Sequence, residues 1–227
     1  KRLNGFTGEV QLHVSGMPTG VTAFAGRILG DAADGCIIFQ AAKGAPLGAA
    51  NVRIYGTAVD GDEEDVVEVD ALAYQETYMP GGGRNHFPVE VHTVSVQAPS
   101  DIQSLKLSTQ EITLRPGEEV RIDVEMTRAE GFDKNISLDV LFKHLSSVWG
   151  DTLPKGVKLD GSKSKILITG KETKGHITLV ADDKIEKVER QQVSVMANIS
   201  LNFVMKATYS SKPLFITTVP KEVEPGK

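Results

Sequence analysis

The chain contains two related copies of one sequence pattern, and this internal repeat restricts its fold more than any single motif. Residues 1–14 align with residues 127–140 at a constant offset of 126, which places Gly5-Phe6 opposite Gly131-Phe132. Residues 17–21 recur as 153–157 at offset 136, residues 37–41 as 177–181 at offset 140, and residues 52–54 as 193–195 at offset 141. A solenoid unit repeats every ~20–50 residues, so a period above 100 indicates two homologous domains.

Length and composition agree with two folded domains. The 227 residues are 40% hydrophobic and 24% charged, an ordinary globular balance for domains of about 100–150 residues. With 25 basic and 30 acidic residues the net charge is −5, so no basic surface is available to neutralise phosphates or anionic lipid. No apolar run approaches the ~18 residues that span a bilayer. We therefore expect neither a nucleic-acid partner nor membrane insertion.

Most of the chain has the alternation of half-buried β-strands. Val10, Leu12 and Val14 alternate with polar residues, and residues 120–126 do the same. Turn signals of the Asn-Gly, Asp-Gly and Pro-x-Gly types fall between these segments at short spacing. This pattern predicts an all-β fold of two tandem immunoglobulin-like β-sandwich domains. We place the first at residues 1–98, the second at 99–219 and a polar tail at 220–227, with Pro99 stiffening the connector.

The second copy contains ten extra residues within 141–152. Leu141, Leu145, Val148 and Trp149 would form one apolar stripe if this insert were helical. An extended hairpin that folds Trp149 over the edge of the sandwich is an equal alternative. In either case Trp149 is expected in a core rather than in a ligand platform.

The first copy lacks counterparts of residues that precede Gly131 in the second. Residues 107–126 have the pattern of two strands and a turn, whereas Gly5 stands near the start of the chain. The visible first domain is therefore expected to lack its N-terminal strands and to have an uncovered sheet edge. We expect the natural polypeptide to extend before Lys1.

The densest acidic run, residues 60–65, provides weak calcium candidates in Asp60, Asp62 and Asp65. The run does not have the spacing of an EF-hand loop. A solvated hairpin tip that turns at Asp60-Gly61 explains it better. No cofactor is therefore expected, and calcium is kept as a weak alternative.

A glycine-rich segment at residues 79–86 is the best candidate for recognition, because binding residues often lie on loops. Tyr74 and Tyr78 precede it, and Arg84 and His86 lie within it. It lacks the Lys-Ser/Thr pair and the helix of a phosphate-binding loop, since Phe87-Pro-Val is extended. The alternative is a plain loop that crosses from one sheet to the other.

No catalytic or metal motif is recognisable. The histidines are single and scattered, at His13, His86, His92, His144 and His176. Cys36 has no second cysteine within zinc-binding distance, and no Gly-x-Ser-x-Gly elbow occurs. Alternation places Cys36 and Ile38 on the outer face of their strand. Either a neighbouring domain, a missing strand or a partner covers this face, or a local twist buries Cys36.

Three segments resemble those of immunoglobulin-like repeats in large exported bacterial proteins: residues 2–10 with their Gly-Phe-x-Gly, residues 17–21 with their Pro-x-Gly-Val, and residues 114–120 with their Arg-Pro-Gly-Glu turn. Such repeats often accompany pre-peptidase C-terminal domains. The resemblance implies a non-catalytic spacer or interaction module that is extracellular, at the cell surface or periplasmic. Its expected partners are other domains of the same polypeptide and protein or glycan at the cell surface. The matched positions are structural, so the resemblance transfers no catalytic residue.

Two other functions stay open. The first is a carbohydrate- or peptide-binding module that uses the 79–86 loop, with Arg84 as a hydrogen-bonding fork and the tyrosines as stacking faces. The second is an accessory domain pair of a secreted hydrolase.

Overall fold

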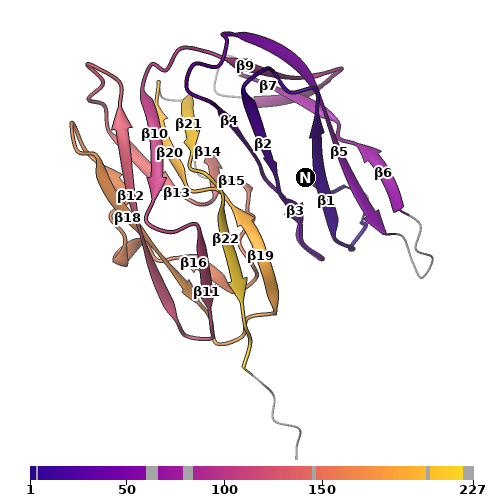
Figure 1. Cartoon of the computed structure of the whole chain (residues 1–227). Helices are drawn as coiled ribbons and strands as arrows, with labels where there is room; N and C mark the ends of the chain where they lie inside the picture. The colour runs from indigo at the N-terminus through magenta and orange to yellow at the C-terminus, as the bar shows by residue number, and fades with distance from the viewer. Residues whose placement is uncertain (4, 60–65, 79–83, 145–146, 203–204, 222–227) are drawn as a thin grey trace, which may run out of the picture. The chain divides into compact units, whose positions relative to one another are not determined.

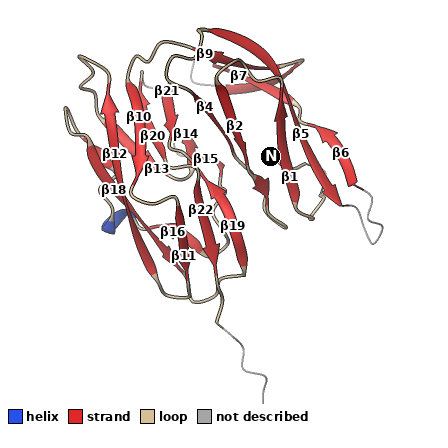
Figure 2. Ribbon diagram, viewed as in Figure 1, coloured by secondary structure: helices blue, strands red, loops and turns tan. Residues whose placement is uncertain are grey.

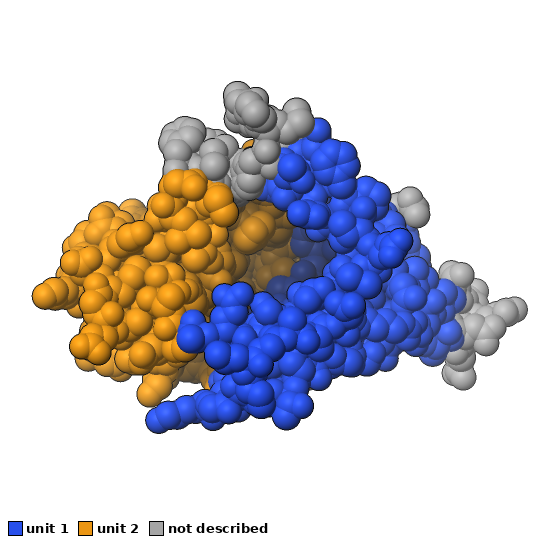
Figure 3. All heavy atoms as spheres, turned by 90° about the horizontal axis from the view of Figure 1, so that it is seen from above, with its two compact units in different colours: residues 1–98 blue, residues 99–227 orange. Residues whose placement is uncertain are grey.

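The regular secondary structure of the described residues is almost wholly β-strand, as expected from the sequence (Figures 1 and 2). The computed structural model describes residues 1–3, 5–59, 66–78, 84–144, 147–202 and 205–221. Within these ranges the helical element is a single 3-10 turn, η1 (Gly161–Lys163). The chain divides into two compact units, unit 1 with residues 1–98 and unit 2 with residues 99–227, coloured separately in Figure 3.

Unit 1 consists of short antiparallel sheets. Its described strands are β1 (Val10–Ser15), β2 (Val21–Ala25), β3 (Arg27–Ile28), β4 (Ile37–Ala41), β5 (Gly48–Val59), β6 (Val66–Asp70), β7 (Ala73–Tyr78), β8 (Arg84–Val89) and β9 (His92–Val96). One sheet has the order β3-β1-β5-β6, and β9 pairs with the first half of the long strand β5. Strands β2 and β4 form a separate pair, and β7 and β8 form a hairpin.

Unit 2 contains more strands around a larger core. They are β10 (Ile102–Leu107), β11 (Glu111–Leu114), β12 (Glu119–Arg128), β13 (Ile136–Asp139), β14 (Phe142–His144), β15 (Ser147–Gly150), β16 (Val157–Leu159), β17 (Leu167–Ile168), β18 (Lys174–Ala181), β19 (Val188–Val193), β20 (Met196–Ser200), β21 (Lys206–Ser210) and β22 (Leu214–Thr218). Three sheets have the orders β10-β12-β18-β16, β17-β13-β20-β21 and β11-β22-β19. Strand β11 runs parallel to β22.

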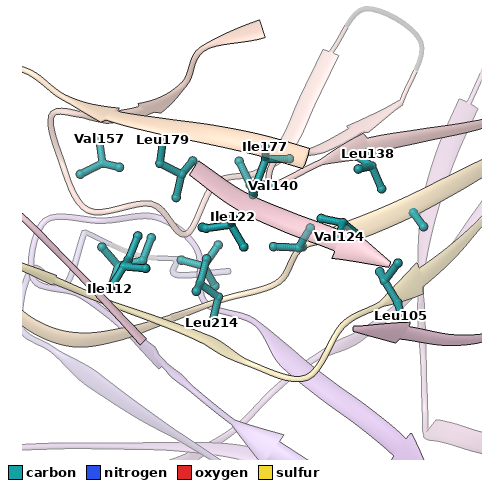
Figure 4. Close-up of a cluster of buried hydrophobic side chains, with 14 of the residues drawn as sticks. Leu105, Ile112, Ile122, Val124, Leu138, Val140, Val157, Ile177, Leu179 and Leu214 are labelled. Atoms are coloured by element: carbon teal, nitrogen blue, oxygen red, sulfur yellow. The ribbon is translucent and has the colours of Figure 1, made fainter. Parts of the chain in front are cut away.

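The alternation of β12 shows how the core of unit 2 forms. Ile122, Val124 and Met126 are buried, while the intervening residues are exposed. They pack with inward side chains of β13, β18, β20 and β22 into one apolar cluster (Figure 4). Among the described residues, twenty-three hydrophobic side chains of unit 2 are buried but only five of unit 1. The two units therefore differ greatly in core size.

The strand registers of the two units correspond at the offsets found in the sequence. In unit 1, Leu12 pairs with Gly56. The sequence offsets of 126 for Leu12 and 141 for Gly56 lead to Leu138 and Ala197, and these two residues pair in unit 2. The correspondence therefore holds for strand pairing and not only for residue identity.

The second pair of offsets behaves in the same way. Val21 pairs with Ala41 in unit 1. Their sequence offsets of 136 and 140 lead to Val157 and Ala181, which pair in unit 2. Strand β1 thus corresponds to β13, β2 to β16 and β4 to β18. The long strand β5 corresponds to β19 and β20 together.

Each unit also has a hairpin that its counterpart lacks. In unit 2 the insert at 141–152 forms the β14-β15 hairpin, which decides between the two conformations that the sequence left open. The expectation that Trp149 belongs to a core is wrong, because its side chain is 40% exposed on this hairpin. In unit 1, residues 71–91 separate β6 from β9 and include β7 and β8, whereas only residues 211–213 separate β21 from β22.

Strand β4 has an apolar side chain on each face. Ile38 is buried and Cys36 is half-buried. Phe39, on the opposite face of the strand, is 38% exposed. The more open apolar face is therefore the one that alternation predicts to point inward.

Candidate interaction surface

The β7-β8 hairpin contains the residues that the sequence singles out for recognition. Its register pairs Tyr74 with Pro88, Glu76 with His86, and Tyr78 with Arg84. Side chains on a strand alternate between faces, so Tyr74, Glu76 and His86 share one face of the hairpin. The structure thereby brings Tyr74 and His86 onto one surface and pairs Tyr78 with Arg84 in the backbone ladder. The side chains of those last two residues and residues 79–83 lie outside the described part.

This face combines an aromatic ring with a hydrogen-bonding pair. Tyr74 is 53% exposed, and His86 Nε2 lies 3.1 Å from a carboxylate oxygen of Glu76. On the opposite face Phe87 is 51% exposed, beside Gln75 of the neighbouring strand. Exposed aromatic rings provide stacking surfaces, and the Glu76–His86 pair provides both donors and acceptors. The hairpin is thus chemically suited to bind a polar ligand that has an apolar face.

Sequence reasoning missed Glu76 and the hairpin itself. Glu76 and His86 are each five positions from Gly81 in the sequence. This symmetry indicates cross-strand pairing around a central turn. Neither residues 73–78 nor residues 84–89 have a continuous apolar face, so the alternation that predicts a strand is missing here.

The outer face of the main sheet of unit 1 carries a charged cluster. Arg53 Nε donates a hydrogen bond to Asp70 at 2.7 Å and another guanidinium nitrogen donates to Glu68 at 2.7 Å. These two hydrogen bonds raise the pKa of Arg53. The guanidinium also lies over the ring of Tyr55, 4.4 Å from its centre. Arg53 thus joins side chains of β5 and β6, and the cluster stabilises the strand ladder.

Unit 2 has a shallow depression of about 670 Å³ over β10, β12 and β18. Most of its charged side chains are paired, with Arg121 bound to Asp123 at 2.8 Å and Lys174 to Glu125 at 3.6 Å. His176 also lines it. A shallow, open depression whose charged groups are mostly engaged offers little to a small ligand.

No group of three or more His, Cys, Asp or Glu side chains with metal-binding geometry occurs in the described ranges. The calcium candidates Asp60, Asp62 and Asp65 lie outside those ranges, so calcium binding stays a prediction. The largest carboxylate perturbation belongs to a turn: hydrogen bonds from Lys165 and then from Thr169 lower the pKa of Glu172 to about 2. That carboxylate stabilises the turn at residues 169–172.

Comparisons with known proteins find only remote likenesses. No family model matches the chain, and no curated protein matches it. A solved structure of domains 4 and 5 of the S-layer protein SbsC has a TM-score of 0.27 and 10% identity, covering 96% of this chain and 74% of that one. BcpA, the major pilin subunit of Bacillus cereus, has a TM-score of 0.29 and 10% identity, covering 93% of this chain and 64% of the pilin. A variant of the same pilin gives 0.30 at 10% identity, covering 92% and 64%.

Likeness at this level assigns neither a family nor a function. The resemblance to repeats that accompany pre-peptidase C-terminal domains therefore stays a prediction. Within the described residues no helix is both long and apolar enough to cross a membrane.

Proposed function

We propose that the chain is a non-catalytic structural module of a larger exported bacterial protein, in which two immunoglobulin-like sandwiches in tandem space or present other domains outside the cell. The observation that carries this proposal is the shared strand register of the two units. What the two copies share is the arrangement of core strands and turns. Duplication of a scaffold lengthens a protein without adding a chemical site.

The strand order of unit 2 supports an immunoglobulin-like assignment. In chain order β10, β12, β13, β16, β18, β20 and β21 take the places of strands A to G. The order β10-β12-β18-β16 then corresponds to A-B-E-D, and β13-β20-β21 to C-F-G.

The parallel pairing of β11 with β22 suits unit 2 to bear tension. Glu111 pairs with Phe215 and Leu114 with Thr218, so both strands run in the same direction. Force that enters before β11 and leaves after β22 pulls the two strands along their length in opposite directions. The ladder bonds then bear the load together, whereas force applied at adjacent ends breaks them one after another.

Single-molecule pulling tests this load-bearing role. Handles are attached to cysteines introduced at Gln110 and Val219, at opposite ends of the ladder, in a Cys36→Ser chain. The matched control uses Gln110 and Lys212, which lie at the same end of the same two strands. We expect a higher rupture force for the first pair. Equal forces for both geometries would remove the support for a tension-bearing spacer.

The β7-β8 hairpin favours a second function, binding of glycan or peptide. Its eighteen additional residues, compared with the link between β21 and β22, expose Tyr74 and Phe87. Replacing residues 71–91 with the Ser-Lys-Pro link at 211–213 is expected to abolish binding on a glycan array or to an immobilised peptide library. Tyr74→Ala should weaken the same binding, while Gln75→Ala on the opposite face should not. Ligand binding that survives loss of the hairpin contradicts this function.

A further inference from the structure

Two strands of unit 1 have a sheet edge that is paired in unit 2. Strand β18 pairs on one side with β16 and on the other with β12, whereas its counterpart β4 pairs only with β2 within the described part of the chain. Likewise β22 pairs with both β19 and β11, but its counterpart β9 pairs only with β5 among the described strands. An unpaired strand edge presents a row of backbone donors and acceptors to a further strand.

The inner face beside these edges is apolar and partly open. At equivalent positions, Phe39 is 38% exposed and Leu179 is fully buried. Val67 and Val69 of β6 pair with Ala58 and Gly56 and so share the inward face of that sheet. They are 42% and 62% exposed.

In unit 2 the corresponding positions are covered by the chain that precedes β13. Tyr209, the counterpart of Val69, packs against the core cluster, and its hydroxyl donates a hydrogen bond to Asp101 at 2.8 Å. Asp101 lies directly before β10. The exposed side chains of unit 1 are therefore those that β10, β11 and β12 would cover.

We infer that the edges of β4 and β9 bind an extended strand pair with the alternation of β11 and β12, that is, a polypeptide segment with the pattern of residues 107–126. The inference concerns unit 1 alone and goes beyond the spacer function. We call the surface formed by the two edges with Phe39, Val67 and Val69 the open face.

Unit 2 specifies the register and chemistry of the occupant. Val120 pairs with Leu179 and Ile122 with Ile177, so the occupant places apolar residues opposite Phe39 and Ile37. Charged residues alternate with them and face solvent, as in β12. The parallel strand lies along β9 as Ile112 lies beside Ile216, with an apolar residue opposite Val94.

The repeat also indicates how such a strand pair can be joined to unit 1. Strand β12 leads into β13 through residues 129–135, and these align one for one with residues 3–9 before β1. A strand pair joined to Lys1 thus reaches β4 through a connection of the same length. Covalent attachment also raises the effective concentration of the strand at its own edge.

The test joins a second copy of residues 99–126 directly before Lys1 of the whole chain, because Thr127 aligns with Lys1. Hydrogen exchange read by mass spectrometry follows peptides that contain β4 and β9. We expect exchange of the outward amides of β4 to slow at least about tenfold, equivalent to about 1.4 kcal/mol. The matched control carries Ile122→Asp and Val124→Asp in the added copy only and should leave exchange at the level of the unextended chain.

A second measurement guards against an added segment that simply fails to fold. Phe39→Ser should change the protection of unit 1 little in the unextended chain, because Phe39 is already exposed, but should reverse most of the gain in the extended chain. Unchanged exchange with the extension, or equal effects of Phe39→Ser in both chains, overturns the inference. Protection of β4 that rises with concentration of the unextended chain also overturns it, because the occupant is then a second copy.

Discussion

Gly175 lies where the β18 backbone passes too close to its neighbours for any side chain. A Cβ atom at this position would lie 2.7 Å from the carbonyl oxygen of Lys165 and 3.1 Å from Cδ1 of Leu138. The φ angle of Gly175 is outside the left-handed region, so the cost of substitution arises from steric overlap. Leu138 can change its rotamer, but the carbonyl moves only if the backbone moves.

The expected cost of Gly175→Ala follows from two opposing effects. Overpacking a core costs about 1–3 kcal/mol. Loss of backbone freedom in the unfolded chain offsets about 0.4–1 kcal/mol of this. The free energy of unfolding should therefore fall by about 1–2 kcal/mol, and each kcal/mol lowers Tm by about 2–8 °C in a domain of this size.

Urea denaturation followed by tryptophan fluorescence measures this loss, because the one tryptophan, Trp149, belongs to unit 2. Gly161→Ala in η1 is the matched control, since a Cβ there meets no atom within 4 Å. The control should have unchanged or slightly higher stability. The steric reasoning is refuted if Gly175→Ala is as stable as the parent chain, or if both substitutions shift the urea midpoint equally.

Three further outcomes follow from the same structure. Leu179→Ala should lower the free energy of unfolding of unit 2 by about 2–5 kcal/mol, because the side chain is fully buried. Phe39→Ala at the equivalent position should lower that of unit 1 by less than half as much, as measured by hydrogen exchange. Equal losses would contradict an open face. Tyr209→Phe removes the hydrogen bond to Asp101 and should lower stability by about 1–2 kcal/mol in urea; burial first and this bond second raise the pKa of Tyr209, so its contribution is present below pH 10 and is lost as the pH rises through the raised pKa. The pKa of Glu172 is lowered from 4.5 to about 2, so its contribution is present above pH 4.5 and disappears as the pH falls to 2; Glu172→Gln should flatten this part of a plot of Tm against pH, and an unchanged slope would contradict the assignment.

The strand pairings of the sandwich could be predicted because the repeat preserves both core alternation and turn chemistry. Gly20 and Gly156 have φ angles of 77° and 85°, a region that favours glycine. The Pro-x-Gly-Val turn therefore recurs for a backbone reason, and it aligns the strands that follow. Once two strands are aligned in both copies, their pairing registers must correspond.

Short sequence patterns do not predict the structure where close backbone packing or short strands determine it. Asp34-Gly35 has the sequence of a turn, yet a Cβ atom on Gly35 would lie 2.9 Å from the carbonyl oxygen of Arg27 and 2.9 Å from Cδ1 of Leu12. Gly35 is thus the counterpart of Gly175, and the same close approach occurs in both units. No single-copy pattern reveals such a contact, because the neighbours are distant in sequence.

The two inserts escaped prediction for a different reason. The apolar spacing of residues 141–149 also suits a short helix, and a few residues do not discriminate between the two periods. Cross-strand pairs such as Lys143 with Val148 decide in favour of the hairpin. The β7-β8 hairpin has polar and aromatic residues on both faces, so only its pairing identifies it as a pair of strands.

The unequal cores of the two units show that inward-facing residues are necessary but not sufficient for burial. Ile37 and Phe39 have the same alternation as Ile177 and Leu179, yet only the latter pair is fully buried. The difference comes from the neighbouring strand, because β12 pairs with β18 and supplies Ile122 and its neighbours to the core of unit 2. Burial stabilises in proportion to the apolar area removed from water. Sequence similarity between the copies therefore predicts equal strand order but unequal stability, and adding a strand pair to unit 1 should raise its stability toward that of unit 2.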